Sequence, residues 1–138
     1  MFVLDTDTLT HLLRGNERVI QKRRQATDEV AITVITRIEV LQGRFASALK
    51  AEDGKKLLLA QQRLEETEND LAKFVTLRVG VGASAEFDRL RQNRKFRKIG
   101  RADLLIAAIA LANQATLVTC NREDFRKAPG LRIENWTE

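Results

Sequence analysis

Residues 1–13 read MFVLDTDTLTHLL, and the architecture expected for the whole chain follows from this stretch. The apolar residues at its start predict a short buried strand over residues 2–5, and residues 8–14 have a helical pattern. Two carboxylates, Asp5 and Asp7, stand at the junction between them. Acidic residues at the end of a buried strand indicate either the cap of the next helix or a cation site.

The remainder of the chain alternates between helical and strand-like patterns. Strands are expected over residues 29–33, 75–80, 115–120 and 131–136, and helices over residues 16–26, 34–45, 54–74, 84–96 and 101–114. Strands separated by helices indicate βαβ units, a parallel sheet and helices on both of its faces. A chain of 138 residues suits one such α/β domain.

Composition excludes several classes of protein and site. A single cysteine, Cys120, cannot form an internal disulfide, and a single histidine, His11, argues against a histidine-rich metal centre. We see no signal peptide and no membrane-spanning run, so we expect a cytoplasmic protein with no membrane partner. We expect Cys120 to be a buried structural thiol, His11 to be a packing or surface residue, and Trp136 to pack at the core edge.

The net charge of +5 comes from two basic clusters. One cluster, opposed only by Asp88, contains Arg89, Arg91, Arg94, Lys95, Arg97, Lys98 and Arg101, and the other contains Arg14, Arg18, Lys22, Arg23 and Arg24. Such clusters attract polyanions, although solvated helix faces carry similar charge. The first cluster matters for function because it leads directly to Asp103.

Four acidic residues occupy positions that a parallel sheet brings to one edge. Asp5 ends the first strand, Glu39 lies in the helix after the second strand, Asp103 opens the apolar helix, and Asp124 follows the strand after it. Ligands of open α/β sheets bind beyond the carboxyl ends of the strands. The four segments therefore predict a shared acidic pocket.

Each acid also has a local explanation. Either aspartate of the opening stretch suits the N-cap of the first helix, and Asp103 suits that of the apolar helix. Glu39 stands three residues after Thr36, which is the spacing of a capping box, and Asp124 suits a turn. Four such residues at strand and helix ends together favour a common site over four separate caps.

Converging carboxylates need a cation. Two carboxylates ~4 Å apart repel by about 4 kcal/mol at an effective dielectric constant near 20, which rivals a domain stability of about 5–15 kcal/mol. Oxygen ligands without His or Cys favour Mg²⁺, with Mn²⁺ as the alternative, over zinc. Such an ion, acidic ligands and nearby basic clusters suit phosphodiester hydrolysis.

Three segments resemble the motifs of a known family. They are FVLDTDTLTHLLRGN, ITVITRIEVLQG and IGRADLLIAAIALANQATLVTCNREDFRKAPGLRIENW. In order and spacing they are similar to the motifs of PIN-domain endoribonucleases, specifically the VapC toxins of type II (VapBC) toxin–antitoxin systems. The resemblance covers nearly the whole chain and is weakest over residues 50–80.

This resemblance implies a single PIN domain over residues 1–138, a three-layer α/β/α fold with a central parallel sheet of four to five strands. It implies a Mg²⁺-dependent endoribonuclease toxin that cuts tRNA or other structured RNA. It also implies a homodimer and a cognate VapB-like antitoxin that covers the pocket.

The resemblance also assigns residues. The catalytic, metal-binding pocket would consist of Asp5, Glu39, Asp103 and Asp124, of which Asp5 and Asp103 would be the most direct ligands. Polar groups supporting these acids would be Thr6, Thr119 and Asn121. With RNA as the implied substrate, the basic cluster that leads to Asp103 supplies the expected RNA-binding residues, which are Arg94, Lys95, Arg97, Lys98 and Arg101.

The sequence departs from the family pattern at Asp7, where asparagine is usual. An ionised aspartate cannot donate the hydrogen bond that an amide offers to a neighbouring carboxylate. We expect Asp7 to be the N-cap of the first helix, with an additional metal ligand as the alternative.

Two other functions remain open at this point. LDTDTL also resembles the Asp-x-Asp-Gly-Thr opening of haloacid-dehalogenase-like phosphatases, although Thr8 and Leu9 replace the Gly-Thr step. A non-catalytic nucleic-acid-binding module with the same fold is the other alternative. The phosphatase would lose activity on substitution of Asp7 as well as Asp5, and the binding module would retain RNA without cutting it.

Overall fold

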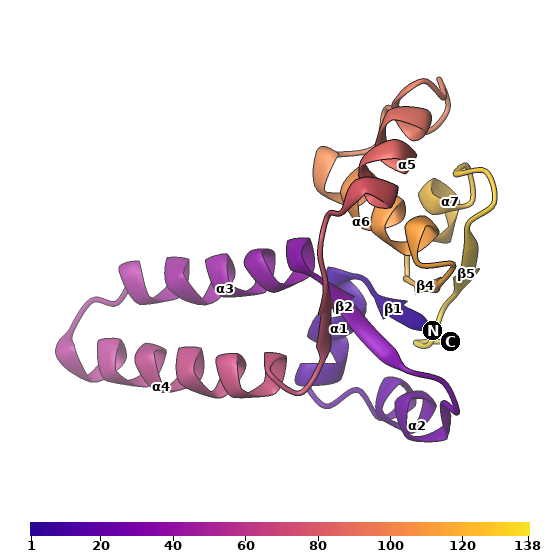
Figure 1. Cartoon of the computed structure of the whole chain (residues 1–138). Helices are drawn as coiled ribbons and strands as arrows, with labels where there is room; N and C mark the ends of the chain where they lie inside the picture. The colour runs from indigo at the N-terminus through magenta and orange to yellow at the C-terminus, as the bar shows by residue number, and fades with distance from the viewer.

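The computed structural model describes all residues 1–138, and its centre is a parallel sheet of five strands (Figure 1). The strands are β1 (Phe2–Leu4), β2 (Val30–Thr33), β3 (Val75–Leu77), β4 (Thr116–Val118) and β5 (Arg132–Glu134). Their order across the sheet is β3-β2-β1-β4-β5, and every neighbouring pair is parallel. The expected α/β fold with a parallel sheet is confirmed.

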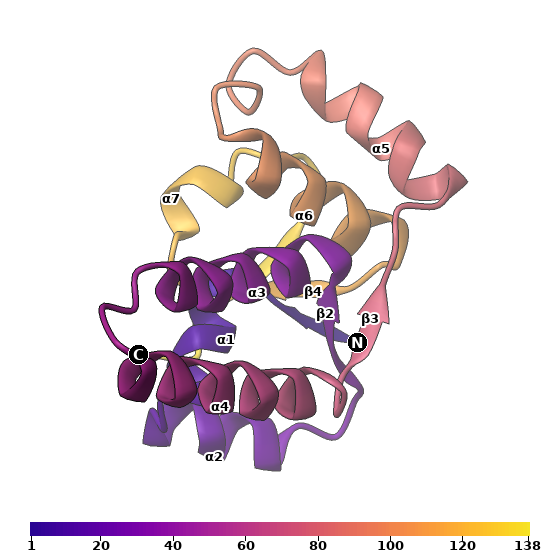
Figure 2. The same ribbon diagram turned by 90° about the vertical axis from the view of Figure 1, so that its left-hand side faces the viewer.

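Seven helices connect and cover the strands. They are α1 (Thr6–Leu13), α2 (Glu17–Gln25), α3 (Val34–Leu49), α4 (Gly54–Leu71), α5 (Val81–Arg91), α6 (Arg101–Ala112) and α7 (Arg122–Phe125). Helices α3 and α4 form a long hairpin that projects away from the sheet (Figure 1). Helices α5, α6 and α7 gather on another side of the molecule (Figures 1 and 2).

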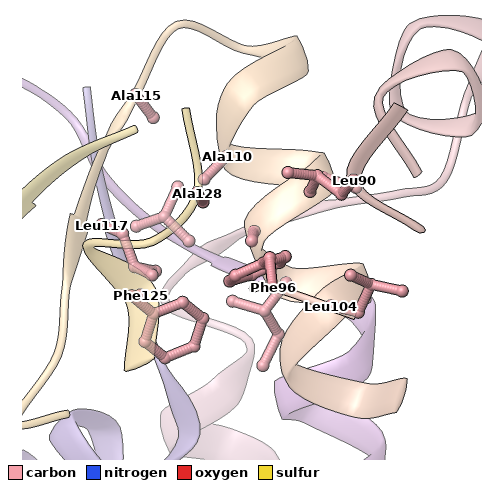
Figure 3. Packing of buried hydrophobic residues seen from close by; sticks show 12 residues of the cluster. Leu90, Phe96, Leu104, Ala110, Ala115, Leu117, Phe125 and Ala128 are labelled. Carbon is pink, nitrogen blue, oxygen red and sulfur yellow. The ribbon is translucent and has the colours of Figure 1, made fainter. Parts of the chain in front are cut away.

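Alternation along the strands divides the core between the two faces of the sheet. Val3 and Leu117 belong to one buried cluster, and Leu4 and Val118, the next residue of each strand, belong to the other. Successive side chains of a strand point to opposite faces, so two apolar layers are required. Figure 3 shows Leu117 in the first cluster, together with side chains from α6, from α7 and from the loop that precedes α6.

Helix α6 is buried on nearly all sides, as its composition predicts. Leu104 and the run from Ile106 to Ala110 are at most 2% exposed. Full burial of a large aliphatic side chain contributes about 1.5–3 kcal/mol, so this helix is held firmly in the first cluster. Its first turn carries Asp103, which is therefore fixed in position.

The expected helix over residues 84–96 is wrong at both ends. Helix α5 begins at Val81 and stops at Arg91. The Asn93 side chain accepts hydrogen bonds from the backbone N–H groups of Lys95 (2.9 Å) and Phe96 (3.3 Å), which favours a turn over helix continuation. Residues 92–100 consequently form a loop, which the completely buried Phe96 ties to the core.

The other expected element boundaries shift by a few residues, and α7 is not predicted by the sequence pattern. Trp136 is buried against Phe2 and donates from Nε1 to Glu134, as expected of a packing residue, and His11 is exposed. The expectation of a buried thiol is wrong, because Cys120 follows the end of β4 and is exposed. None of the helices is long and apolar enough to cross a membrane.

Candidate active site

Asp5 joins the end of β1 to the start of α1. It is the N-cap of α1, and its Oδ1 accepts from the Thr8 backbone N–H at 2.9 Å. Its own N–H donates to the Val118 carbonyl, so it sits between the two central strands. Burial raises the pKa of Asp5, while hydrogen bonds from Thr119 and Thr8 act in the opposite direction. The cap and the predicted site residue are one and the same side chain.

Asp7 is not the N-cap of α1, contrary to expectation. It lies exposed in the first helical turn, because Asp5 already occupies the capping position. The negative charge of Asp7 nevertheless raises the pKa values of both Asp5 and Asp103. Asp7 is therefore near the same edge of the sheet and adds to the negative potential there.

A chain of hydroxyl groups holds Glu39. Thr6 Oγ1 donates to Glu39 Oε1 at 2.7 Å and lies 3.0 Å from Thr36 Oγ1. Since a hydroxyl has one proton, Thr36 donates to Thr6, which donates to Glu39. The capping-box explanation is wrong, because the N-cap of α3 is Thr33, whose Oγ1 accepts from the Thr36 N–H at 3.1 Å.

Asp103 lies in the first turn of α6, three residues after Gly100, which is the N-cap. It therefore does not cap the helix. Burial, followed by the negative charges of neighbouring carboxylates, raises the pKa of Asp103 to about 6; these neighbours are Asp5, Glu39, Asp7 and Asp124. The structure thus brings the other three predicted acids, together with Asp7, within electrostatic reach of Asp103.

Asp124 is held by Asn121 at the start of α7. Asn121 Nδ2 donates to Asp124 Oδ2 at 2.8 Å, and Asn121 Oδ1 accepts from the Asp124 N–H at 3.4 Å. The Asn121 N–H in turn donates to Thr119 Oγ1 at 2.9 Å. Each predicted polar group therefore contacts an acid or another supporting group. Thr36, which sequence reasoning assigned to a cap, extends this set.

The donor set fits a hard divalent cation. All the converging side-chain donors are oxygens, and no Lys or Arg forms an ion pair with Asp5, Glu39 or Asp103. No three of these side chains lie close enough together to form a complete ion-binding site without water or substrate ligands. Among divalent cations, Mg²⁺ commonly keeps several waters and binds through one or two carboxylates, so it does not need a complete cage of protein ligands.

A basic hollow adjoins Asp124. We use this name for the depression lined only by Arg94, Lys95, Arg97, Lys98 and Lys127. Lys127 Nζ lies 4.0 Å from Asp124 Oδ1, so the hollow and the acidic pocket meet at this pair. The fifth predicted RNA-binding residue, Arg101, lies instead over the Phe87 ring at 5.4 Å. Sequence reasoning missed Lys127, whose i,i+3 spacing from Asp124 was the available signal.

Comparison with known proteins identifies the family. The PIN domain family model matches residues 2–131. Ribonuclease VapC2 of Rickettsia felis is 36% identical over 107 residues, covering 78% of this chain and 74% of the relative. The tRNA(fMet)-specific endonuclease VapC of Salmonella typhimurium is 27% identical over 138 residues, covering 98% and 97%.

Structural similarity agrees with the sequence comparisons. The crystal structure of DNA-bound VapBC from Salmonella typhimurium matches with a TM-score of 0.80 and 25% identity, covering 98% of this chain and 97% of that one. The PIN-like α/β/α fold, predicted from the motifs, is confirmed. The chain therefore belongs to the PIN-domain family, among the VapC ribonuclease toxins of toxin–antitoxin systems.

Proposed function

We propose that this protein is a Mg²⁺-dependent endoribonuclease, with Mn²⁺ as an alternative ion, that hydrolyses RNA at the pocket of Asp5, Glu39, Asp103 and Asp124. The observation that carries this proposal is that acids from separate segments face one edge of the sheet: Asp5 at the end of β1, Glu39 held by Thr6, and Asp124 held by Asn121, all near Asp103. Burial and these neighbouring charges raise the pKa of Asp103, and a bound cation would reduce the repulsion.

The chain's own groups have distinct parts in this reaction. Asp5 and Asp103 would hold the ion most directly, and Glu39 and Asp124 would act directly or through water. When bound, the ion polarises the scissile phosphate and lowers the pKa of water. The Thr6 hydroxyl fixes Glu39, and the Asn121 amide fixes Asp124, so both carboxylates are oriented to position the attacking water.

The basic hollow supplies the substrate contacts. Its four predicted members and Lys127 would bind RNA phosphates, with Arg101 beside Asp103 at the start of α6. Lys127, 4.0 Å from Asp124, would place a bound backbone at the edge of the acidic pocket. We infer a structured RNA as substrate, tRNA being the leading candidate, because the Salmonella relative is named a tRNA(fMet)-specific endonuclease.

The proposed protein partners are a VapB-like antitoxin and a second copy of the chain. The structural neighbour from Salmonella is a VapBC assembly, which supports an antitoxin partner. An inhibitor that covers this pocket must bring hydrogen-bond donors or positive charge, since a carboxylate buried without a partner costs several kcal/mol. The homodimer would use the exposed apolar residues of α3, which include Ile38, Phe45 and Leu49.

The test is incubation of purified protein with total RNA and with tRNA transcripts, followed by sequencing of the new RNA ends. We expect cleavage with Mg²⁺ and none with EDTA. Asp5→Asn and Asp103→Asn should each abolish cleavage with an unchanged circular-dichroism spectrum. Asp88→Asn, a substitution on the exposed side of α5, is the matched control and should leave cleavage unchanged.

The same preparations separate the alternatives. Cutting at the wild-type rate by either pocket variant would show that the assignment is wrong. Retention of RNA without cutting in Mg²⁺ would indicate a binding module. Hydrolysis of p-nitrophenyl phosphate that requires Asp7 as well as Asp5 would indicate the phosphatase.

A further inference from the structure

A groove between α1 and α3 opens beside the acidic pocket. Thr6 and Glu39 line it, and so do Arg14, Arg44 and Gly43. Only two of its nine lining residues are hydrophobic. We propose that this groove is a second RNA subsite, which binds a phosphate of the strand next to the scissile one. The inference deepens the proposed nuclease function and rests on it.

The two arginines of the groove have no acidic partner. No carboxylate lies within ion-pair distance of Arg14 or Arg44. Arg14 is exposed at the C-terminal end of α1, and Arg44 is half-buried on α3. Both residues line the groove, and Arg44 also lines a second depression beside α4. Unpaired guanidinium groups are suited to phosphate, which they bind through paired N–H donors.

Arg44 is oriented in advance. Its Nε donates to Thr67 Oγ1 at 2.9 Å, and this buried hydroxyl donates to the Arg63 carbonyl at 2.8 Å. The hydrogen bond to Thr67 uses only Nε, so the two terminal nitrogens of the guanidinium remain for a ligand. A pre-oriented side chain loses less entropy on binding, which increases affinity.

Gly43 has no packing reason to be glycine. It lies in the interior of α3, where glycine is among the least favourable residues. A Cβ built there meets no atom within 4 Å, and its φ is not in the left-handed region. Because Gly43 lines the groove, its missing side chain keeps the wall open for close approach of a sugar–phosphate backbone.

The groove and the basic hollow adjoin different acids of the pocket. Figure 2 shows α7 and the loop of residues 92–100 on one side of α3, and α1 on the other. Glu39 lines the groove, and Asp124 lies beside Lys127 of the basic hollow. An RNA strand that crosses the pocket would therefore meet positive charge both before and after the scissile phosphate.

The chemistry of the groove favours RNA over a protein ligand. Its hydroxyl and guanidinium groups match phosphate and the ribose 2′-hydroxyl. A neighbouring surface of α3, with Ile38, Leu41, Phe45 and Leu49, is almost wholly apolar and has the composition expected of a protein contact. The two surfaces of α3 thus differ in the class of partner that they suit.

The first test measures RNA affinity without cleavage. A labelled single-stranded RNA of ~12 nucleotides is titrated with full-length Asp103→Asn protein in EDTA, and its anisotropy is followed. Arg14→Gln and Arg44→Gln, each added to this protein, should raise the Kd several-fold and reduce the salt slope by about 0.7. Arg78→Gln removes the same charge from an exposed position outside the groove, and its Kd should change little.

Two further variants separate the groove's shape and orientation from its charge. Gly43→Ala should raise the melting temperature, because alanine favours the helix, and yet weaken RNA binding; Gly43→Leu should weaken it more. Thr67→Val keeps every charge but removes the hydroxyl that orients Arg44. It should raise the Kd for RNA, but by less than Arg44→Gln does.

The outcomes are distinct from those for the nuclease itself. If both arginine variants have the same Kd for RNA as Arg78→Gln, the subsite is absent. This conclusion holds whether or not the variants still bind the antitoxin. If they bind weakly while wild-type protein fails to cut in Mg²⁺, the groove is an RNA site but the nuclease assignment is wrong. If the arginine variants bind RNA weakly and the wild-type protein cuts RNA in Mg²⁺, the subsite and the nuclease assignment are both supported.

Discussion

Asp103 binds its proton more tightly in the folded chain than in the unfolded chain. Burial and neighbouring carboxylates raise its pKa from 3.8 to about 6. Between these values the unfolded state loses the proton first, so stability falls as pH rises through this window, and the penalty is complete above pH ~6. Without a divalent ion, Asp103→Asn should therefore melt above wild type at pH ~7.5 and converge with it near pH ~4.

Thermal melts across this pH range, followed by circular dichroism, provide the measurement. Asp88→Asn controls for the loss of any one carboxylate. Because Asp88 lies outside the pocket, this variant should show no comparable pH-dependent difference in melting temperature from wild type. Added Mg²⁺ should raise the melting temperature of wild type more than that of Asp103→Asn. A difference independent of pH would contradict the proton linkage.

Proton competition at the same carboxylate predicts the pH dependence of ion binding. Under the proposed function Mg²⁺ binds the ionised form of Asp103, and its affinity should then be nearly constant above pH ~7 and fall below pH ~6. With one proton displaced, the decrease approaches about tenfold per pH unit. Isothermal titration calorimetry in buffers of different ionisation enthalpy measures both the affinity and the released proton. A flat profile down to pH ~5 would place the ion away from Asp103.

At the scale of the element, the loop of residues 92–100 depends on one buried side chain. Phe96 is fully buried, and the centroid of its ring lies 6.4 Å from that of Phe125 (Figure 3). In the sequence it stands between Lys95 and Arg97 of the hollow. Phe96→Ala should reduce the free energy of unfolding by about 3–5 kcal/mol and weaken RNA binding through the loosened loop. Urea denaturation and anisotropy measure the two effects.

The matched control is Leu58→Ala on α4. Leu58 is 60% exposed and lies outside the proposed dimer surface, so its truncation should change the free energy of unfolding by about 1 kcal/mol or less. If both variants unfold at the same urea concentration, Phe96 does not anchor the loop in solution.

Elements with a regular pattern were predictable from the sequence, and those set by single polar contacts were not. The apolar runs around Leu4, Ile32 and Leu117 predict buried strands, and the structure contains all three. Helix α5 stops early because the Asn93 side chain bonds to the backbone ahead of it, and no periodicity signals that contact. The choice of Asp5 over Asp7 as the cap depends on the same kind of local geometry.

At the scale of the molecule, the topology made it predictable that the acids lie toward one edge of the sheet. Parallel strands end at the same edge, so segments as distant as those of Asp5 and Asp124 both come near Asp103. The polar contacts that support these acids were harder to predict from the sequence. The hydroxyl chain from Thr36 through Thr6, and the approach of Lys127 to Asp124, depend on how helices from different segments pack.

The exposed apolar residues of α3 predict the assembly of the whole molecule. Ile38, Phe45 and Leu49 are 47%, 49% and 75% exposed, which is unusual for side chains of this size grouped on one helix. We expect sedimentation velocity to give the mass of a dimer. Phe45→Glu should convert it to monomer, because a charge in this surface is costly to bury. A monomeric wild type would exclude α3 as the dimer interface.

The central position of β1 has a consequence for synthesis of the protein. β1 is translated before its partner on one side, β4, which follows more than a hundred residues later. At about 5–20 residues per second, the residues between these two strands take on the order of 5–25 s to be made. During that time β1 and Asp5 have no β4 beside them, so we expect the acidic pocket to stay incomplete until translation has passed Asp103 and Asp124.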